Sequence, residues 1–411
     1  MRNRTALLTL LITCSFSATA QLLQPAYSDS NVHQDLIELD GVLEYQGTSV
    51  RREMLNTLLF GGFIDNDMKG RSFDKHGEFN RLGGNANAEI RFIRGSGKFL
   101  RYDTLTWMVK AAYTVVGNMD YGQDAFGLLF YGNSSYVGAT ADLKNTKLDF
   151  MQFQKVGFGL VDKKKRSSIT LNLVNVQNYA EGFIRKGELT QNADGSQIDM
   201  TMNGNFQYTQ GTNFSKGIGA AIDIDYRIRV PWLKETFTTF QVSAQNLGFA
   251  YMHDGVKQYK VDSSYTYSGF EFDSFNDGNN PLGTDFSLLD SLGIDSRVSK
   301  RTVMLPGYIQ AMKLVDLDSP KKVQSFFGIR LYPTFASVPL VFAGAYWKAA
   351  SFLHASASVS YGSFGSLKGG IYATLILDKV NFMIGTDNLI GLVSGSGFGE
   401  SVVTKLIWKL N

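Results

Sequence analysis

The stretch Ile218–Arg229, IGAAIDIDYRIR, alternates without an error between two kinds of side chain. One face carries Ile218, Ala220, Ile222, Ile224, Tyr226 and Ile228, and the other carries Gly219, Ala221, Asp223, Asp225, Arg227 and Arg229. A period of two indicates a β-strand with one apolar and one polar face. Strands that cross a membrane at a tilt need about 9–11 residues, whereas strands of soluble proteins average about five or six. The length of this stretch therefore favours a membrane-spanning strand.

Four more runs alternate in the same way. Their ranges are 86–92, 105–116, 240–245 and 353–361. Aromatic residues lie near the strand ends on the apolar faces, among them Trp107, Tyr226, Tyr361 and Trp408, as in the interfacial girdle of an outer-membrane barrel. A soluble β-sandwich also alternates, but with shorter strands and more turn prolines. We therefore expect an all-β fold: one transmembrane antiparallel β-barrel of about fourteen strands.

Composition excludes several other classes of protein. The formal net charge is +3, with no basic excess of the kind that nucleic-acid binding needs. The chain is 44% hydrophobic and 13% aromatic, which argues against disorder. Cys14 is the only cysteine, so a disulfide scaffold is excluded.

The N-terminus is typical of a secretory signal peptide. Arg2 and Arg4 precede a short apolar run, residues 6–12, and Ala18-Thr19-Ala20 is a small-residue cleavage site. We expect residues 1–20 to be removed on export and the mature protein to reside in the cell outer membrane.

Two regions of the mature chain do not follow the strand pattern. Residues 21–84 are expected to form either a plug or lid at the barrel mouth, with a short helix near residues 50–59, or early strands with an irregular start. The barrel is assigned to residues 85–411. Within it, residues 269–296 form a long connection with six acidic residues before Ser296 and no Lys or Arg, which we interpret as an extended loop.

Polar side chains on the inward face of the strands are the candidate site. An arginine facing lipid at the bilayer midplane costs about 2–4 kcal/mol, so the charged face should line the lumen. The predicted lumen-lining residues are Glu89, Arg91, Lys110, Asp223, Asp225, Arg227, Arg229, Gln241, Gln245, His354 and Ser356. They would either line a conduit or hold a plug, or simply pair across a narrow lumen. Their mixed signs argue against a strongly ion-selective pore.

Catalytic and metal-binding motifs are weak. His354 and Ser356 share one strand face, so a lipid hydrolase is one alternative; it needs a third group that orients the histidine. Residues 273–278 resemble part of a calcium loop, but Phe275 stands where a ligand is required and Thr284 where the bidentate glutamate should be. No catalytic residue, metal site or cofactor is predicted.

A family resemblance rests on six short segments and their order. They are FYGN at 130–133, VGFG at 156–159, QNLGF at 245–249, YSGF at 267–270, LPGY at 305–308 and IGTDNL at 384–389. Together they resemble a family of uncharacterised outer-membrane β-barrel proteins from Bacteroidota. That family is more distantly similar to long-chain fatty-acid-transporter-like barrels and to barrels that accompany type IX secretion and gliding.

The resemblance implies a location and a fold rather than a chemistry. We expect a non-enzymatic outer-membrane protein, and favour a passive conduit for a small hydrophobic or amphipathic solute. The alternatives are a membrane-embedded subunit of a secretion or gliding complex, and the lipid hydrolase. The expected partners are outer-membrane lipid and either a small hydrophobic molecule or secretion-complex proteins, with no nucleic acid.

Overall fold

A computed structural model describes residues 26–27, 34–95, 99–232, 236–267, 295–334, 338–394 and 397–410. The barrel strands are β2 (Leu36–Gly47), β3 (Asn80–Ile93), β4 (Leu105–Tyr121), β5 (Thr140–Asp142), β6 (Thr146–Asp162), β7 (Ser168–Gln191), β8 (Ile198–Tyr208), β9 (Gly217–Trp232), β10 (Thr236–Tyr267), β11 (Asp295–Met304), β12 (Tyr308–Lys313), β14 (Val323–Leu331), β15 (Leu340–Lys348), β16 (Leu353–Tyr361), β17 (Leu367–Ile376), β18 (Val380–Thr386) and β19 (Gly399–Lys409). The other elements are β1 (Ala26–Tyr27), β13 (Val315–Asp316), α2 (Arg52–Phe60), α3 (Asn66–Phe73), α4 (Gln123–Tyr131), η1 (Ser134–Tyr136) and α6 (Leu389–Val393).

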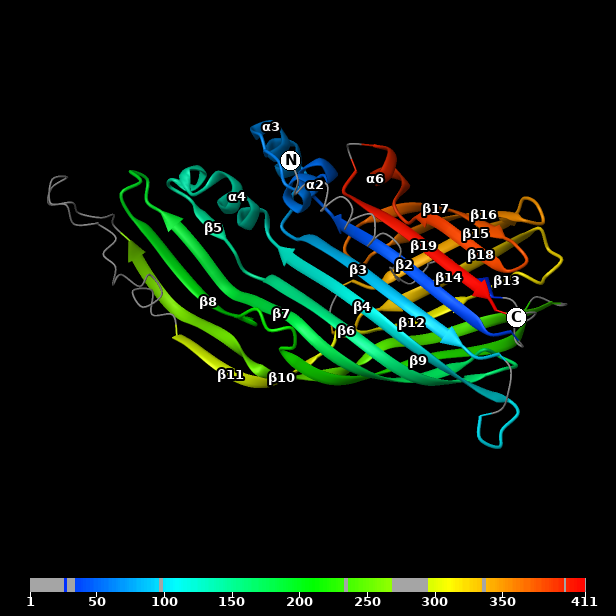
Figure 1. Ribbon diagram of the computed structural model, residues 1–411. Helices are drawn as coiled ribbons and strands as arrows, with labels where there is room; N and C mark the ends of the chain where they lie inside the picture. The colour runs from blue at the N-terminus through cyan, green and yellow to red at the C-terminus, as the bar shows by residue number, and fades with distance from the viewer. Residues whose placement is uncertain are drawn as a thin grey trace, which may run out of the picture.

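The strands form one closed antiparallel barrel, in which β19 pairs with β2 (Figure 1). Three positions in the circuit each hold two collinear strands: β5 and β6, β8 and β9, and β11 and β12. For example, β8 ends where Tyr208 pairs with Ala180, and β9 resumes where Gly217 pairs with Val176 of the same strand, β7. Counted this way the barrel has fourteen strands, which confirms the predicted fold and strand number.

Side-chain exposure follows the alternation that predicts the strands. On β9, Ile218 and Ile222 are 59% and 39% exposed, whereas Ala221 and Asp223 are 3% and 4% exposed. The apolar side chains therefore point outward and the charged ones inward, as a barrel surrounded by lipid requires. The outward aromatics Tyr361 and Trp408 lie at strand ends and are about half exposed.

The two ends of the barrel differ. One end has short turns, such as those that join β6 to β7 and β17 to β18. The first residue of β2 and the last residue of β19 lie at this same end. The other end carries α2, α3, α4 and α6 and the extended upper parts of β7, β8, β10 and β11 (Figure 1). Because outer-membrane barrels keep short turns on the periplasmic side, we assign the helical end to the outside.

The barrel starts earlier in the chain than predicted. Its first strand, β2, begins at Leu36, and the predicted boundary at residue 85 falls inside β3. The period of β2 is hard to recognise because Gly41 stands on the lipid-facing side and Val42 faces inward. The helix expected near residues 50–59 is α2. None of the described helices is long and apolar enough to span a bilayer.

Several predictions fall outside the described residues. They concern the signal peptide, residues 1–20, and the acidic loop, of which residues 269–294 are not described. The calcium-like motif at 273–278 belongs to the same segment. Only the last two residues predicted for that loop, Asp295 and Ser296, are described, and they begin β11.

Candidate functional site in the barrel interior

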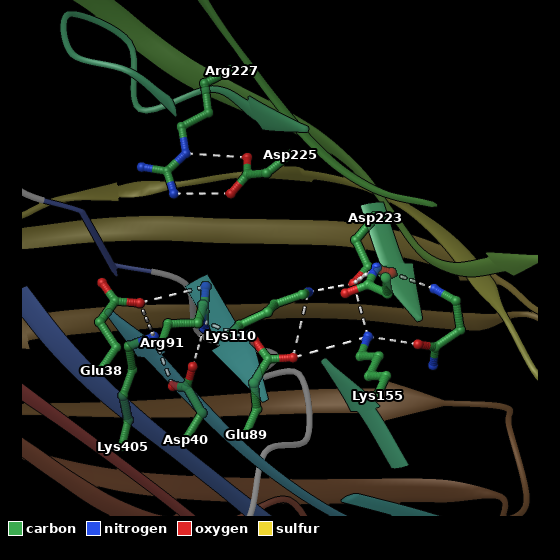
Figure 2. A network of polar contacts seen from close by, with 12 residues as sticks. Glu38, Asp40, Glu89, Arg91, Lys110, Lys155, Asp223, Asp225, Arg227 and Lys405 are labelled. Atoms are coloured by element: carbon green, nitrogen blue, oxygen red, sulfur yellow. Dashed lines mark hydrogen bonds and ion pairs between the residues drawn. The ribbon is translucent and has the colours of Figure 1, made fainter. Parts of the chain in front are cut away.

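Eight charged side chains form a continuous chain of ion pairs on the inner wall of the barrel (Figure 2). We call this set the luminal charge network: Glu38, Asp40, Glu89, Asp223, Arg91, Lys110, Lys155 and Lys405. Four are acids and four are bases, so their formal charges cancel. They come from six strands: β2, β3, β4, β6, β9 and β19.

Asp223 is the centre of one half of the network. Its Oδ2 accepts hydrogen bonds from Lys110 Nζ, from Lys155 Nζ at 2.8 Å and from Asn172 Nδ2 at 3.1 Å. Its Oδ1 accepts one from the backbone N–H of Asn246 at 2.6 Å. Both carboxylate oxygens are therefore satisfied, which a buried charge requires.

A bulge in β10 supplies the Asn246 contacts. The pairing of β10 with β9 shifts between Ala244 and Leu247, and Asn246 has a φ of 55°. A β-bulge with a residue in the left-handed region turns a side chain that the regular period would place elsewhere. Here it directs Asn246 inward, where its Oδ1 accepts a hydrogen bond from Lys155 Nζ at 2.6 Å.

Gly157 on β6 makes room for the contact between Lys110 and Asp223. These two residues lie on β4 and β9, which are separated by β6 and β7. Gly157 pairs with both Lys110 and Asn172, and a Cβ on it would meet the Asn172 side-chain oxygen at 2.2 Å. A larger residue at this position would occupy the space that the two charges cross.

Arg91 is the centre of the other half. Its guanidinium contacts Asp40, lies 3.0 Å from Glu89 Oε1 and lies 3.4 Å from Glu38 Oε2. Lys405 Nζ lies 2.8 Å from Asp40 Oδ1. The strand register places these groups together, because Arg91 pairs with Glu38 across β2 and β3, and Lys405 pairs with Asp40 across β19 and β2.

The two halves of the network differ in burial. The side chains of Lys110 and Lys155 are each 2% exposed and that of Asp223 is 4% exposed. Arg91 and Lys405 in the other half are 25% and 22% exposed. Charges that lined a water-filled channel would be accessible to water, so the half around Asp223 is packed in the interior rather than lining a pore.

An apolar cluster lies on the extracellular side of the network. Its members are Val116, Met151, Phe153, Val174, Val176, Tyr179, Ala221, Ala250, Met252, Val256, Val303, Leu305 and Phe364. On β4, β6 and β9 they occupy positions closer to the extracellular end than Lys110, Lys155 and Asp223 do. A second apolar cluster, Leu36, Ile93, Met108 and Val161, lies on the periplasmic side of the network on the same strands. A cavity of about 550 Å³ lies at the periplasmic ends of β15 to β19.

The helices outside the barrel pack on the strand ends. Met54 and Leu55 of α2 are buried with Tyr45, Tyr121 and Phe126 in one apolar cluster. We call α2, α3 and α4 the helical cap. That part of residues 21–84 plugs the lumen remains a prediction.

His76 joins the cap to the barrel. Its Nδ1 lies 2.9 Å from the carbonyl of Ser72, and its Nε2 lies 3.1 Å from the Tyr121 hydroxyl. Burial lowers the pKa of this imidazole below its ordinary value of 6.5. The neutral ring suits both contacts, since one nitrogen donates to the carbonyl and the other accepts from the hydroxyl.

The structure places six of the eleven predicted lumen-lining residues among the inward charges. Glu89, Arg91, Lys110 and Asp223 belong to the network, and Asp225 and Arg227 form a separate ion pair of 3.0 Å nearby (Figure 2). Gln241 and Gln245 are partly buried on β10 and outside both sets.

Arg229 differs from the prediction. It lies near the periplasmic end of β9 and is exposed, with its guanidinium 5.7 Å from the ring centre of Phe237. Its position on the inward face of the strand does not bring it into the closed interior, because the strand there approaches the water phase.

His354 and Ser356 are both buried on the inward face of β16. His354 Nδ1 contacts the hydroxyl of Tyr346. Ser356 Oγ has no hydrogen-bond partner within the described part of the chain, so no base activates it in this state. Within that same part, no group of three or more His, Cys, Asp or Glu side chains is arranged to hold a metal ion.

The prediction missed four network members: Glu38, Asp40, Lys155 and Lys405. The first two alternate on β2, a signal that was available in the sequence. Lys155 stands between Phe153 and Gly157 on the inward face of β6. Because this face is partly apolar, the sequence there does not alternate clearly between polar and apolar residues.

Comparison with solved structures finds outer-membrane proteins at low sequence identity and low TM-scores. The P. putida toluene transporter TodX matches at 9% identity with a TM-score of 0.36, over 91% of this chain and 87% of its own. The translocator domain of the autotransporter NalP from Neisseria meningitidis matches at 8% identity and 0.28, over 92% and 88%. Outer membrane phospholipase A from Escherichia coli matches at 7% and 0.19, over 90% and 91%.

No curated protein matches the sequence. A family model, in contrast, matches most of the chain. Residues 61–387 match the model of a family of unknown function, DUF5723. These residues include all of the barrel except β2 and β19, together with α3 and α4. The chain, a closed antiparallel barrel of the outer-membrane type, belongs to this family.

Proposed function

We propose that the protein is a non-enzymatic outer-membrane barrel, exported by a cleaved signal peptide, that admits a small hydrophobic or amphipathic solute, and that the luminal charge network is its gate. The observation that carries the proposal is a charge-balanced network in an interior that is apolar on both sides of it, with a cavity at the periplasmic end. A solute with an apolar part suits these apolar regions, and the cavity offers it space beyond the gate.

Charged groups suit a gate better than apolar ones. Buried ion pairs stabilise a fold little compared with apolar packing, because each ion loses its hydration. Their members are also well solvated when separated. The network can therefore open to water without exposing apolar surface, which an apolar plug could not do.

Uptake into proteoliposomes tests the proposal. The probe is phenyl glucoside, an amphipathic and poorly permeant molecule, with glucose as the matched polar control. Wild-type protein should admit phenyl glucoside faster than protein-free vesicles do, with a smaller effect on glucose. Asp223→Asn, which weakens the gate, should raise uptake, and Asp225→Asn, which affects a separate pair, should not. No uptake above protein-free vesicles for either wild type or Asp223→Asn would reject the conduit, and phospholipid hydrolysis in the same vesicles would reject the non-enzymatic assignment.

One observation favours a second candidate, a membrane-embedded subunit of a secretion or gliding complex. The cap and α6 expose large apolar side chains, with Phe60, Phe63 and Val393 between 70% and 85% exposed. The family that the sequence motifs resemble is more distantly similar to barrels that accompany type IX secretion and gliding, which favours the same class of complex. Affinity purification in mild detergent from a native outer membrane should then recover defined complex components with the wild type, and lose them with Phe60→Ser plus Phe63→Ser.

A further inference from the structure

The cavity at the periplasmic mouth is lined from two sides. Its wall consists of residues at the periplasmic ends of β15 to β19, and its cover is the segment between β12 and β14. The lining residues are Leu317, Asp318, Lys322, Lys348, Ala349, Ala350, Ser351, His354, Ile376, Asn381 and Lys409. At about 550 Å³ it falls within the range of about 300–1,000 Å³ typical of small-molecule sites.

The lining is positively charged. Three lysines, Lys322, Lys348 and Lys409, face one acid, Asp318, and none of the three forms an ion pair with a carboxylate in the described ranges. Lys348 Nζ instead donates to backbone carbonyls, including that of Leu317 at 2.7 Å. A backbone carbonyl accepts a hydrogen bond from the lysine ammonium group but does not neutralise its charge, so the cavity keeps a positive potential.

A buried polar group without a partner also lines the cavity. Asn381 is 7% exposed, and its Oδ1 has no hydrogen-bond partner in the part of the chain described here. His354, which also lines the cavity, is 5% exposed and its Nδ1 contacts the Tyr346 hydroxyl. Buried polar groups are normally paired, and this amide oxygen of Asn381 is an acceptor, so a donor such as water or the P–OH of a phosphate monoester would satisfy it.

Apolar side chains complete the wall. Leu317, Ala349, Ala350 and Ile376 contribute hydrocarbon surface between the lysines. Inorganic phosphate alone would leave this surface and most of the volume unused. A molecule that carries both an anionic group and a short apolar body uses all of the lining.

We propose that this cavity binds a small organic anion, with its carboxylate or phosphate held by Lys322 and Lys409 and its apolar body against Leu317 and Ile376. Lys348 holds the covering segment through its carbonyl contacts and adds charge. Binding at this site does not require passage through the barrel, so it is tested at equilibrium on the closed protein and stands or falls apart from the proposed gate.

Isothermal titration calorimetry on the protein in phosphatidylcholine nanodiscs tests the site. The ligands are hexyl phosphate, hexanoate, hexanol and inorganic phosphate. Hexyl phosphate and hexanoate should bind. Hexanol, which lacks the anionic group, and inorganic phosphate, which lacks the apolar body, should bind at least about ten-fold more weakly. Equal binding of hexanol and hexyl phosphate would show partition into apolar surface and overturn the proposal.

The matched variants locate the binding site. Lys322→Gln combined with Lys409→Gln should weaken the binding of hexyl phosphate about ten-fold or more, since both charged donors to the anion are lost. Lys321→Gln removes a neighbouring lysine that does not line the cavity, and should leave the affinity unchanged. If Lys321→Gln weakens binding as much as the double variant, the ligand is responding to overall charge and the site is wrong. Heat-modifiable migration on gels verifies that each variant is folded.

Discussion

Replacing Asp223 by asparagine removes one charge from the centre of the luminal network and almost no volume. The substitution leaves the ammonium groups of Lys110 and Lys155 in place, each on a side chain that is 2% exposed. The nearest remaining carboxylate of the network is Glu89, at 3.6 Å from Lys110 and 4.0 Å from Lys155. One acid must then balance two buried lysines, and it already lies 3.0 Å from Arg91.

The expected loss is about 3–5 kcal/mol of unfolding free energy, the cost of removing one partner from a buried ion pair. Asp225→Asn is the matched control, because among the described residues Asp225 forms an ion pair only with Arg227, and both side chains are about one-fifth exposed. Water screens that pair, so its loss should be about 1 kcal/mol or less. The test is whether Asp223→Asn loses more unfolding free energy than Asp225→Asn, rather than the exact value of either loss.

Guanidinium unfolding in lipid vesicles, followed by tryptophan fluorescence, measures both losses. Adding Lys110→Met to Asp223→Asn restores the charge balance of the network and should recover part of the stability, which a double-mutant cycle quantifies. A loss of unfolding free energy for Asp223→Asn no larger than that for Asp225→Asn would show that Asp223 does not balance buried charge. The same conclusion follows if the loss caused by Lys110→Met simply adds to that of Asp223→Asn.

Two further predictions concern the outer surface and the cap. Ile222→Arg places a charge on the lipid-facing side of β9 and should cost up to about 2–4 kcal/mol in the same unfolding assay, whereas Ile222→Leu should be close to neutral; equal stabilities would mean that this face does not contact lipid. The lowered pKa of His76 means that the folded cap binds a proton less readily than the open chain, so the stability that it contributes is present above pH 6.5 and is lost as the pH falls below that value. The protection factors of α3 amides, which correct for the slower intrinsic exchange at lower pH, should therefore fall between pH 7.5 and 5.5 in the wild type and change less in His76→Gln. A pH response of equal size in that variant would disprove the role of the imidazole.

Much of the barrel could be predicted because the signal was local. An inward charge and an outward isoleucine alternate on β9 within a few residues of each other, and lipid makes any other orientation costly. That single requirement fixes the faces of the strand and so predicts Asp223 as inward. Arg229 obeys the same period, but the requirement weakens at the strand end, where water replaces lipid.

The partners within the network could not be predicted because they depend on register and on irregular backbone. Asn246 reaches Asp223 only because the bulge in β10 interrupts the period that would otherwise assign its face. Lys110 reaches Asp223 across two intervening strands, over Gly157. Both contacts depend on how tightly the wall curves, and a pattern of side chains along one strand carries no information about curvature.

The composition of the interior bears on why a barrel would close itself with charges. Apolar residues of similar volume would make the same wall at least as stable, because buried ion pairs are often matched or exceeded by hydrophobic replacements. The chain uses that apolar solution in the neighbouring compartment, where Phe153 and Met252 are fully buried. Apolar packing and the charge network lie at neighbouring levels of one lumen. The charges are therefore not there because this fold is unable to pack apolar side chains inside. Separated, hydrated side chains cost least at the level of the charges, which is the property that the proposed gate requires.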